Sequence, residues 1–271
     1  MPFKKEPIAL KKRYNKYMLY LKALVLHFQN ILRLFLSSYV SSNRCLVCKT
    51  QTFSSLPLCS FCIHNFFYKP LAKRINRPSL YCKHCGIPLI SEKGNCVLCK
   101  QKINEEKITT VTKQFVLYPY LNKYTDIVLK WKNEEIRTLS PFFAFLIAYF
   151  IKKTPTLKGI PIVPVPPRPK KLKTKGWDQI EDICTFLETF YSFKINHLLG
   201  RLDGHSQKGL SKKERESNLK EKIYLKKHKN IPEKIIILDD VITTGSTMKA
   251  CINVLKEAGC KIIYPLVIFF N

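Results

Sequence analysis

The chain has 271 residues, of which 46% are hydrophobic and 12% aromatic, and this composition excludes an intrinsically disordered protein. Its 47 Lys and Arg residues against 19 Asp and Glu residues give a formal net charge of +28. This imbalance predicts a polyanionic partner, with nucleic acid ahead of an anionic membrane surface. The alternative is that many lysines are merely solvated. The length allows one large or two medium domains.

The N-terminal segment, residues 1–42, is predicted to be a basic arm followed by an amphipathic helix. Residues 18–40 are apolar apart from Lys22, His27 and Arg33. No small-residue cleavage site follows, which argues against a signal peptide, and the charges make a transmembrane helix marginal. A helix packed on the protein body is favoured, with a helix on a membrane surface as the alternative.

Eight of the eleven cysteines form four C-x-x-C pairs, and the spacing of the first four recurs in the second four. Two such pairs supply a tetrahedral four-thiolate site typical of zinc, in a reducing, cytoplasmic compartment. We therefore predict a double zinc ribbon over residues 43–102, with interleaved pairing and an iron–sulfur cluster as alternatives. His64 and His84 are interpreted as bystanders. The predicted ligands are Cys45, Cys48, Cys59, Cys62, Cys82, Cys85, Cys96 and Cys99.

The rest of the chain, residues 108–271, has the pattern of a parallel-sheet α/β domain. Strands are predicted over 109–121, 160–167, 235–238 and 262–270, and helices over 126–151, 178–191 and 248–259. Ser140 and Pro141 suit the cap and first position of a second helix within 126–151. Residues 201–222 are polar and basic, which predicts an exposed loop or arm.

The stretch "IIILDDVITTGST", residues 235–247, carries the candidate ligand site. Four buried apolar residues lead into Asp239 and Asp240, and ligands bind at the carboxyl ends of parallel strands. Two carboxylates can hold neighbouring hydroxyls of a ribose, directly or through Mg²⁺. Hydroxyls and backbone N–H groups at a helix N-terminus suit a phosphate. The alternative is a simple turn and helix cap.

This stretch resembles the phosphoribosyl-pyrophosphate (PRPP) motif of type I phosphoribosyltransferases. The likeness continues through "CKHCGIPL", "LKWKNE", "VPVPPRP", "KGWDQI" and "QKGLSKKERESN", which occur in the order found in ComF-type proteins, a family linked to natural DNA uptake in bacteria. It covers roughly residues 30–271. The resemblance implies a type I phosphoribosyltransferase-like parallel sheet flanked by helices, preceded by the small double zinc ribbon.

The resemblance also implies roles for individual residues. Asp239 and Asp240 would hold the ribose, and the 5′-phosphate would lie on Thr243, Thr244, Gly245, Ser246 and Thr247. The pyrophosphate-side residues would be Val165, Pro166, Arg168, Lys175 and Gln179. The mobile catalytic loop would include Gln207, Lys212, Lys213 and Arg215. The chain has Lys175 and Asp178 where the family often has Arg and Asn, which favours Gln179 over Lys175 as the equivalent residue.

Two functions follow as hypotheses. In the first, the protein binds PRPP with Mg²⁺, is linked to DNA uptake, and transfers a phosphoribosyl group to an acceptor that the sequence does not identify. In the second, it is a non-catalytic single-stranded-DNA-binding factor that uses the fold as a scaffold or PRPP sensor. Under either hypothesis, the expected partners are PRPP, single-stranded DNA and components of a DNA-uptake machine at the inner membrane. Base-stacking candidates are Phe66, Phe67, Tyr68, Tyr81 and Trp131.

Overall fold

The computed structural model describes residues 43–52, 56–83, 86–97, 99–101, 114–120, 123–202, 222–226 and 230–270. The chain divides into two compact units, Met1–Cys59 and Ser60–Asn271. The basic arm and amphipathic helix predicted for residues 1–42 lie outside the described residues, and the three predicted domain ranges remain predictions. Within the described part of the chain, no helix is long and apolar enough to cross a membrane.

The described part of the first unit is a short antiparallel pair, β1 (Asn43–Arg44) and β2 (Gln51–Thr52), around a cysteine knuckle. The Cys45 amide donates to the Thr50 carbonyl at 2.8 Å, and the Lys49 amide donates to the Cys45 carbonyl at 2.9 Å. Lys49 has a positive φ of 65°, which closes the turn. The C-x-x-C sequence thus folds back on itself before the chain continues.

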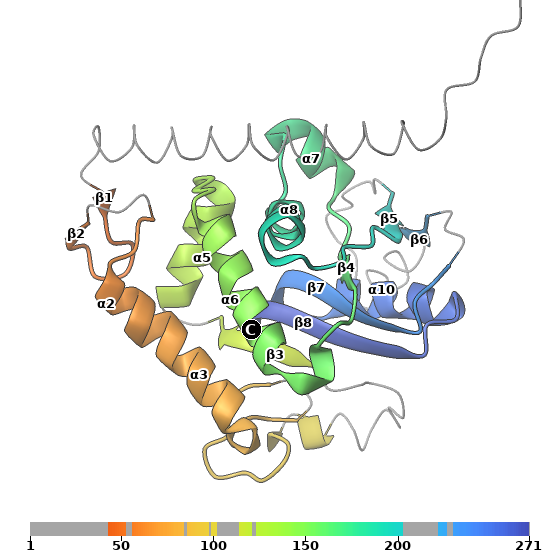
Figure 1. Ribbon diagram of the computed structural model, residues 1–271, viewed down its shortest axis with the longest axis horizontal. Helices are drawn as coiled ribbons and strands as arrows, with labels where there is room; N and C mark the ends of the chain where they lie inside the picture. The colour runs from red at the N-terminus through yellow and green to blue at the C-terminus, as the bar shows by residue number, and fades with distance from the viewer. Residues whose placement is uncertain are drawn as a thin grey trace, which may run out of the picture. The chain divides into compact units, whose positions relative to one another are not determined.

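A four-stranded parallel sheet forms the centre of the second unit (Figure 1). The residues from Ile235 to Leu238 are fully buried, as expected for a strand covered on both faces. The prediction of a parallel-sheet α/β fold is confirmed. The strand order is β3-β8-β7-β4, with bounds β3 (Phe115–Pro119), β4 (Ile162–Pro164), β7 (Lys234–Ile242) and β8 (Ile262–Phe270).

Helices cover both faces of the sheet. On one face, Met248 and Leu255 of α10 (Ser246–Glu257) belong to the same buried cluster as Ile237 of β7. On the other face, the ring of Phe115 in β3 contacts that of Phe150 in α6, with the ring centroids 5.9 Å apart. The remaining helices and strands of this region are α5 (Lys123–Asn133), α6 (Leu139–Lys153), η3 (Pro155–Leu157), α7 (Pro169–Lys175), α8 (Gln179–Tyr191), β5 (Leu199–Arg201) and β6 (Ile223–Leu225).

The second unit begins with a continuous helical segment whose middle part has π-helical hydrogen bonds. Its parts are α2 (Ser60–Cys62), η1 (Ile63–Tyr68) and α3 (Lys69–Asn76), followed by the short turn η2 (Pro78–Leu80). Phe67 is fully buried and makes edge-on ring contacts with Tyr118, Tyr124 and Phe142. The Tyr118 hydroxyl donates to the Phe67 carbonyl at 3.0 Å. These contacts attach η1 to the sheet.

Three local predictions differ from the structure. The residue before helix α6 is Thr138 instead of Ser140, because Ser140 is fully buried in the first turn and accepts a hydrogen bond from Trp131 Nε1 at 3.1 Å. Phe67 and Trp131, two base-stacking candidates, are fully buried in the core and therefore cannot stack on a nucleic acid. Strand β7 continues past Leu238 to Ile242, so the two aspartates lie within it.

Candidate functional site

The two loops predicted to hold a ligand leave neighbouring strands of the sheet. Strands β4 and β7 are paired in parallel, with Pro164 opposite Leu238. Beyond the last paired residues, the Val165 amide donates to the Leu238 carbonyl at 2.9 Å. Because both strands run in the same direction, the segment after Pro164 and the segment after Leu238 meet at the carboxyl edge of the sheet.

The turn after β7 is built to place backbone N–H groups at the start of α10. Gly245 adopts the left-handed conformation, with φ 75°, immediately before the helix. A Cβ at this position would have Ile242 as its nearest neighbour, at 3.9 Å, which is an ordinary van der Waals distance. Glycine is therefore favoured because of the positive φ, and not because space is lacking. The Thr244 and Ser246 hydroxyls lie 3.0 Å apart beside the first turn. Hydroxyls and orphan amides at a helix N-terminus form an anion site.

The two adjacent carboxylates have different surroundings. Asp239 Oδ1 accepts from the Asp240 amide at 2.8 Å, and Asp240 Oδ1 accepts from the Val241 amide at 2.6 Å. Burial, reinforced by the neighbouring Asp240, raises the pKa of Asp239 to about 8. Without a ligand, this shift favours the protonated form of Asp239.

Lys132, near the end of α5, supplies the counter-charge for the second carboxylate. Its Nζ lies 2.6 Å from Asp240 Oδ2, and the Asp240 side chain is only 14% exposed. Lys132 belongs to the "LKWKNE" segment, yet sequence reasoning assigned it no role, because the chain gives no signal for an ion pair between residues so far apart. The ion pair thus compensates the charge of Asp240.

The proline-containing loop after β4 brings Arg168 close to a second arginine. Val165 and Pro166 are buried, whereas Arg168 is exposed at the start of α7. Burial, and after it the positive charge of Arg168, lowers the pKa of Arg201 at the end of β5, and Asp239 counteracts that shift. Arg201 is therefore influenced both by the charge of Arg168, after β4, and by that of Asp239, in β7. Sequence reasoning missed it, because it precedes a long polar stretch without a motif of its own.

Two further predicted residues of the pyrophosphate side lie where α7 meets α8. Lys175 Nζ donates to the Lys132 carbonyl at 2.8 Å and lies 3.8 Å from Glu135 Oε1. Gln179 is fully buried, and its Oε1 accepts from Lys171 Nζ. Lys175 and the Gln179 oxygen are thus engaged within the protein, whereas Gln179 Nε2 is buried without a hydrogen-bond partner among the described residues. Gln207, Lys212, Lys213 and Arg215 of the predicted mobile loop lie outside the described residues.

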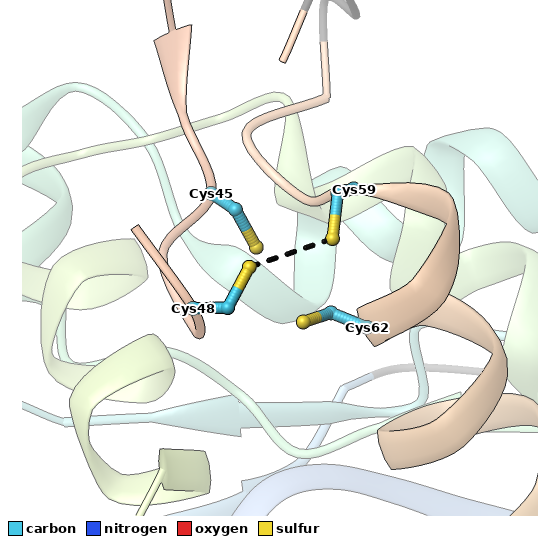
Figure 2. Close-up of side chains that lie close together, drawn as sticks. All are labelled: Cys45, Cys48, Cys59 and Cys62. Carbon is cyan, nitrogen blue, oxygen red and sulfur yellow. Dashed lines mark hydrogen bonds between the residues drawn. The ribbon is translucent and has the colours of Figure 1, made fainter. Parts of the chain in front are cut away.

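The first cysteine block forms a cluster of four sulfur atoms that converge on one point (Figure 2). Cys45, Cys48, Cys59 and Cys62 have Sγ atoms that all lie within 4.8 Å of one another. The Cys48 and Cys59 sulfurs are 3.6 Å apart, and zinc with four bonds of about 2.3 Å needs sulfur–sulfur distances of about 3.8 Å. The four residues therefore fit a tetrahedral metal ion.

The chemistry of this cluster also suits a metal. The Cys48 sulfur lies 2.8 Å from the Thr50 hydroxyl, and hydrogen bonds from the Thr50 side chain and backbone lower the pKa of Cys48 to about 6. This shift favours the thiolate, which is the form that binds metal. His64 is exposed and its ring stacks on Tyr68. Among the described residues, the cluster consists of cysteines alone and contains no histidine.

The second cysteine block forms a separate cluster. Cys82, Cys96 and Cys99 are buried with their sulfur atoms within 4.8 Å of one another, and Cys85, the predicted fourth ligand, lies outside the described residues. The three cysteines pack against Ile87, Leu89 and Phe270. Within the described part of the chain, cysteines thus cluster by block, which supports the predicted pairing over the interleaved one.

Comparisons with known proteins agree with this arrangement. Residues 205–271 match the family model described as "Phosphoribosyl transferase domain". The chain is similar to the competence protein ComFC of Streptococcus pneumoniae, with 27% identity over 235 residues that cover 80% of this chain and 96% of that protein. It is also similar to the hypoxanthine/guanine phosphoribosyltransferase of Methanococcus maripaludis, with 31% identity over 166 residues that cover 59% of this chain and 77% of that protein.

A search of solved structures found a hypoxanthine phosphoribosyltransferase from Staphylococcus aureus. It has 14% identity and a TM-score of 0.29, and the match covers 50% of this chain and 62% of that one. The sequence relatives, the family model and the two cysteine clusters lead to one conclusion: the chain is a ComFC-like protein with N-terminal cysteine clusters, and it belongs to the phosphoribosyltransferase family.

Proposed function

We propose that this protein binds PRPP together with Mg²⁺ at the carboxyl edge of the sheet and takes part in DNA uptake. The observation that carries the proposal is the hydrogen bond from the Val165 amide to the Leu238 carbonyl, which joins the strands that lead into the two loops. A sugar with a phosphate at each end needs two anion sites beside a pair of carboxylates. The link to DNA uptake rests on the name of the streptococcal relative, a competence protein.

Each part of the site has a task in this proposal. Asp239 and Asp240 accept hydrogen bonds from the ribose hydroxyls, and the turn from Thr243 to Thr247 binds the 5′-phosphate. The loop from Val165 to Arg168 faces the diphosphate. When bound, Mg²⁺ neutralises diphosphate charge. Transfer of the phosphoribosyl group to an acceptor would then depend on positioning and on cations that stabilise the departing diphosphate.

Calorimetric titration of the whole protein with PRPP and Mg²⁺ tests the ligand assignment. Replacing both carboxylates, Asp239→Asn with Asp240→Asn, should weaken PRPP binding at least about tenfold, because each lost hydrogen bond to a charged group contributes about 1.5–3 kcal/mol. The matched control is Glu233→Gln, an exposed carboxylate just before the same strand, roughly 20 Å away. Equal PRPP affinity in the wild type and the double variant would remove the ribose assignment.

Turnover is tested separately. Diphosphate release is measured with PRPP, Mg²⁺ and a panel of nucleobases and other acceptors. Release that depends on one acceptor would establish a transferase, whereas binding without release across the panel would favour a PRPP sensor. Arg168→Gln should reduce PRPP affinity more than affinity for ribose 5-phosphate, since only PRPP carries the diphosphate.

A second candidate function, binding of single-stranded DNA, is favoured by a row of three aromatic rings, of which Tyr68 and Phe145 are exposed and the middle one, Tyr149, is half-buried. Tyr68 and Tyr149 have ring centroids 5.5 Å apart, and Phe145 stacks on Tyr149 at 6.5 Å. Tyr68 is 38% exposed and Phe145 is 43% exposed. Rings that reach the surface at this spacing on a strongly basic chain suit successive bases. The other two candidates, Phe66 and Tyr81, are half-buried and are covered by cations, since Lys123 lies over Phe66 and Arg74 over Tyr81.

Fluorescence anisotropy with oligothymidine at several salt concentrations tests this candidate. The affinity should fall steeply with salt if several phosphates are contacted. Tyr149→Ala should weaken binding about fivefold or more, because stacking contributes about 1–3 kcal/mol per base. Phe190→Ala, which removes an exposed ring from α8, is the control and should bind as the wild type does. Equal loss in both variants would contradict a specific stacking surface.

A further inference from the structure

Two lysines on helix α5 offer a natural comparison. Lys130 and Lys132 have the same side-chain exposure, 30%, and each forms an ion pair. The partner of Lys130 is Glu134 on the same helix, at 2.9 Å, and that carboxylate is 57% exposed. Such a surface pair contributes little to stability. The partner of Lys132 is Asp240, which is 14% exposed at the carboxyl edge of the sheet.

The Lys132 ammonium is within reach of anything that Asp240 binds. Its Nζ lies 2.6 Å from Asp240 Oδ2, while Asp240 Oδ1 already accepts from the Val241 amide. A hydroxyl that donates to Oδ2 at an ordinary hydrogen-bond distance would be at most about 5.5 Å from Nζ. A substituent on the neighbouring carbon of a ribose, such as a diphosphate, would therefore come within range of the lysine charge.

The backbone that carries Lys132 is fixed from two sides. Trp131 is fully buried, and its Nε1 donates to Ser140 at 3.1 Å. Lys175 Nζ donates at 2.8 Å to the carbonyl of Lys132, one of the last carbonyls of α5, which have no partner within the helix. A cation at the C-terminal end of a helix is also favoured by the helix dipole. Lys175 thus contacts the backbone of Lys132 directly.

We propose that Lys132 is a further ligand-binding residue of this site, directed at the diphosphate of a 1-diphosphorylated ribose, and that Lys175 is a positioning residue that acts through it. Without ligand, the Lys132 ammonium compensates Asp240. With ligand, the same ammonium bridges the carboxylate and a diphosphate oxygen, which suits a compact charge with three donors. This inference rests on the proposed function and adds to it a cation supplied by α5.

The test uses the whole protein and two ligands, PRPP and ribose 5-phosphate, each titrated with Mg²⁺ by calorimetry. Lys132→Met should weaken PRPP binding at least about tenfold and ribose 5-phosphate binding less than about threefold, because only PRPP carries the diphosphate. Lys132→Arg, which keeps the charge, should restore most of the PRPP affinity. Lys130→Met is the matched control and should bind both ligands as the wild type does.

Lys175 is tested by a double-mutant cycle. Lys175→Met alone should weaken PRPP binding, and the variant with both substitutions should bind no more weakly than Lys132→Met, because Lys175 acts through Lys132. Additive losses would show that Lys175 contacts the ligand itself and would overturn its positioning role. Thermal unfolding of each variant, with Lys132→Gln as a second substitution, verifies that the proteins tested are folded.

The remaining outcomes separate this inference from the proposed function. A wild type that binds no PRPP would remove both. A wild type that binds PRPP while Lys132→Met binds it equally well would remove only the role of Lys132. Tighter PRPP binding by Lys132→Met would also overturn the inference, because Lys132 would then compete with the sugar for Asp240.

Discussion

Asp178, the residue before helix α8, caps that helix and connects it to helix α7. Its Oδ1 accepts from the amides of Ile180 at 2.9 Å and Glu181 at 3.3 Å, and its Oδ2 lies 2.7 Å from Lys171 Nζ. Replacing Asp178 by Ala removes the helix cap and the ion pair together. Replacing it by Asn keeps an acceptor for the cap and removes only the charge.

The structure gives a magnitude for each part. Loss of the cap costs about 1 kcal/mol. The ion pair contributes up to about 1 kcal/mol, since Lys171 is 30% exposed and also donates to Gln179, while the Asp178 side chain is 9% exposed. Asp178→Ala should therefore lower the free energy of unfolding by about 2 kcal/mol. For a chain of this size, that corresponds to a midpoint lower by about 4–8 °C.

Thermal unfolding followed by circular dichroism measures the effect. Asp178→Asn should lower the midpoint by about 2–4 °C, which is the ion-pair part alone. Glu188→Ala removes an exposed carboxylate from the same helix and should shift the free energy by less than about 0.5 kcal/mol. If Asp178→Asn were as destabilising as Asp178→Ala, the cap would contribute nothing beyond the ion pair and the reasoning would be refuted.

Two more predictions follow from the carboxylate pair and the cysteines. Burial raises the pKa of Asp239 to about 8, whereas the pKa of an unfolded aspartate is about 3.9. Between these two pH values the folded protein keeps a proton that the unfolded chain releases. The free energy of unfolding therefore falls as the pH rises from about 4 to about 8. Asp239→Asn should therefore raise the unfolding midpoint at pH 7.5 and leave it nearly unchanged at pH 4, in scans compared with Asp126→Asn; a lower midpoint at pH 7.5 would contradict this. Cys48→Ser and Cys82→Ser should each reduce bound zinc from two ions to one per chain by elemental analysis, because each removes a ligand from a different cluster, while Cys184→Ala should keep two. Loss of both ions in either single variant would speak against independent sites.

The sequence predicted those parts of the fold that depend on local pattern. The run from Ile235 to Leu238 forms a doubly covered strand because unbroken branched apolar residues suit a buried parallel sheet. Gly245 lies at the turn where a positive φ is needed. The helix expected from residue 178 forms with Asp178 as its cap.

What the sequence did not predict depends on contacts between distant segments. Ser140 has the chemistry of a helix cap, yet the indole of Trp131 takes its hydroxyl. Trp131 was interpreted as a base-stacking candidate from its basic neighbours. Successive residues of a helix are rotated by about 100°, so neighbours in sequence point in different directions, and Trp131 faces the core. The pairing of Lys132 with Asp240 has no local signature, because it requires α5 and β7 to be placed first.

The order of strands also affects how the protein is made. Within the described residues, β3 pairs only with β8, and β8 fills the gap between β3 and β7. The ribosome produces residues 115–119 long before residues 262–270, and at about 5–20 residues per second the interval is roughly 7–30 s. During that time β3 has both edges unpaired, and exposed strand edges promote association between chains. Sheet assembly therefore has to wait for β8, and a nascent chain that stalls before residue 262 would be a natural target for chaperones.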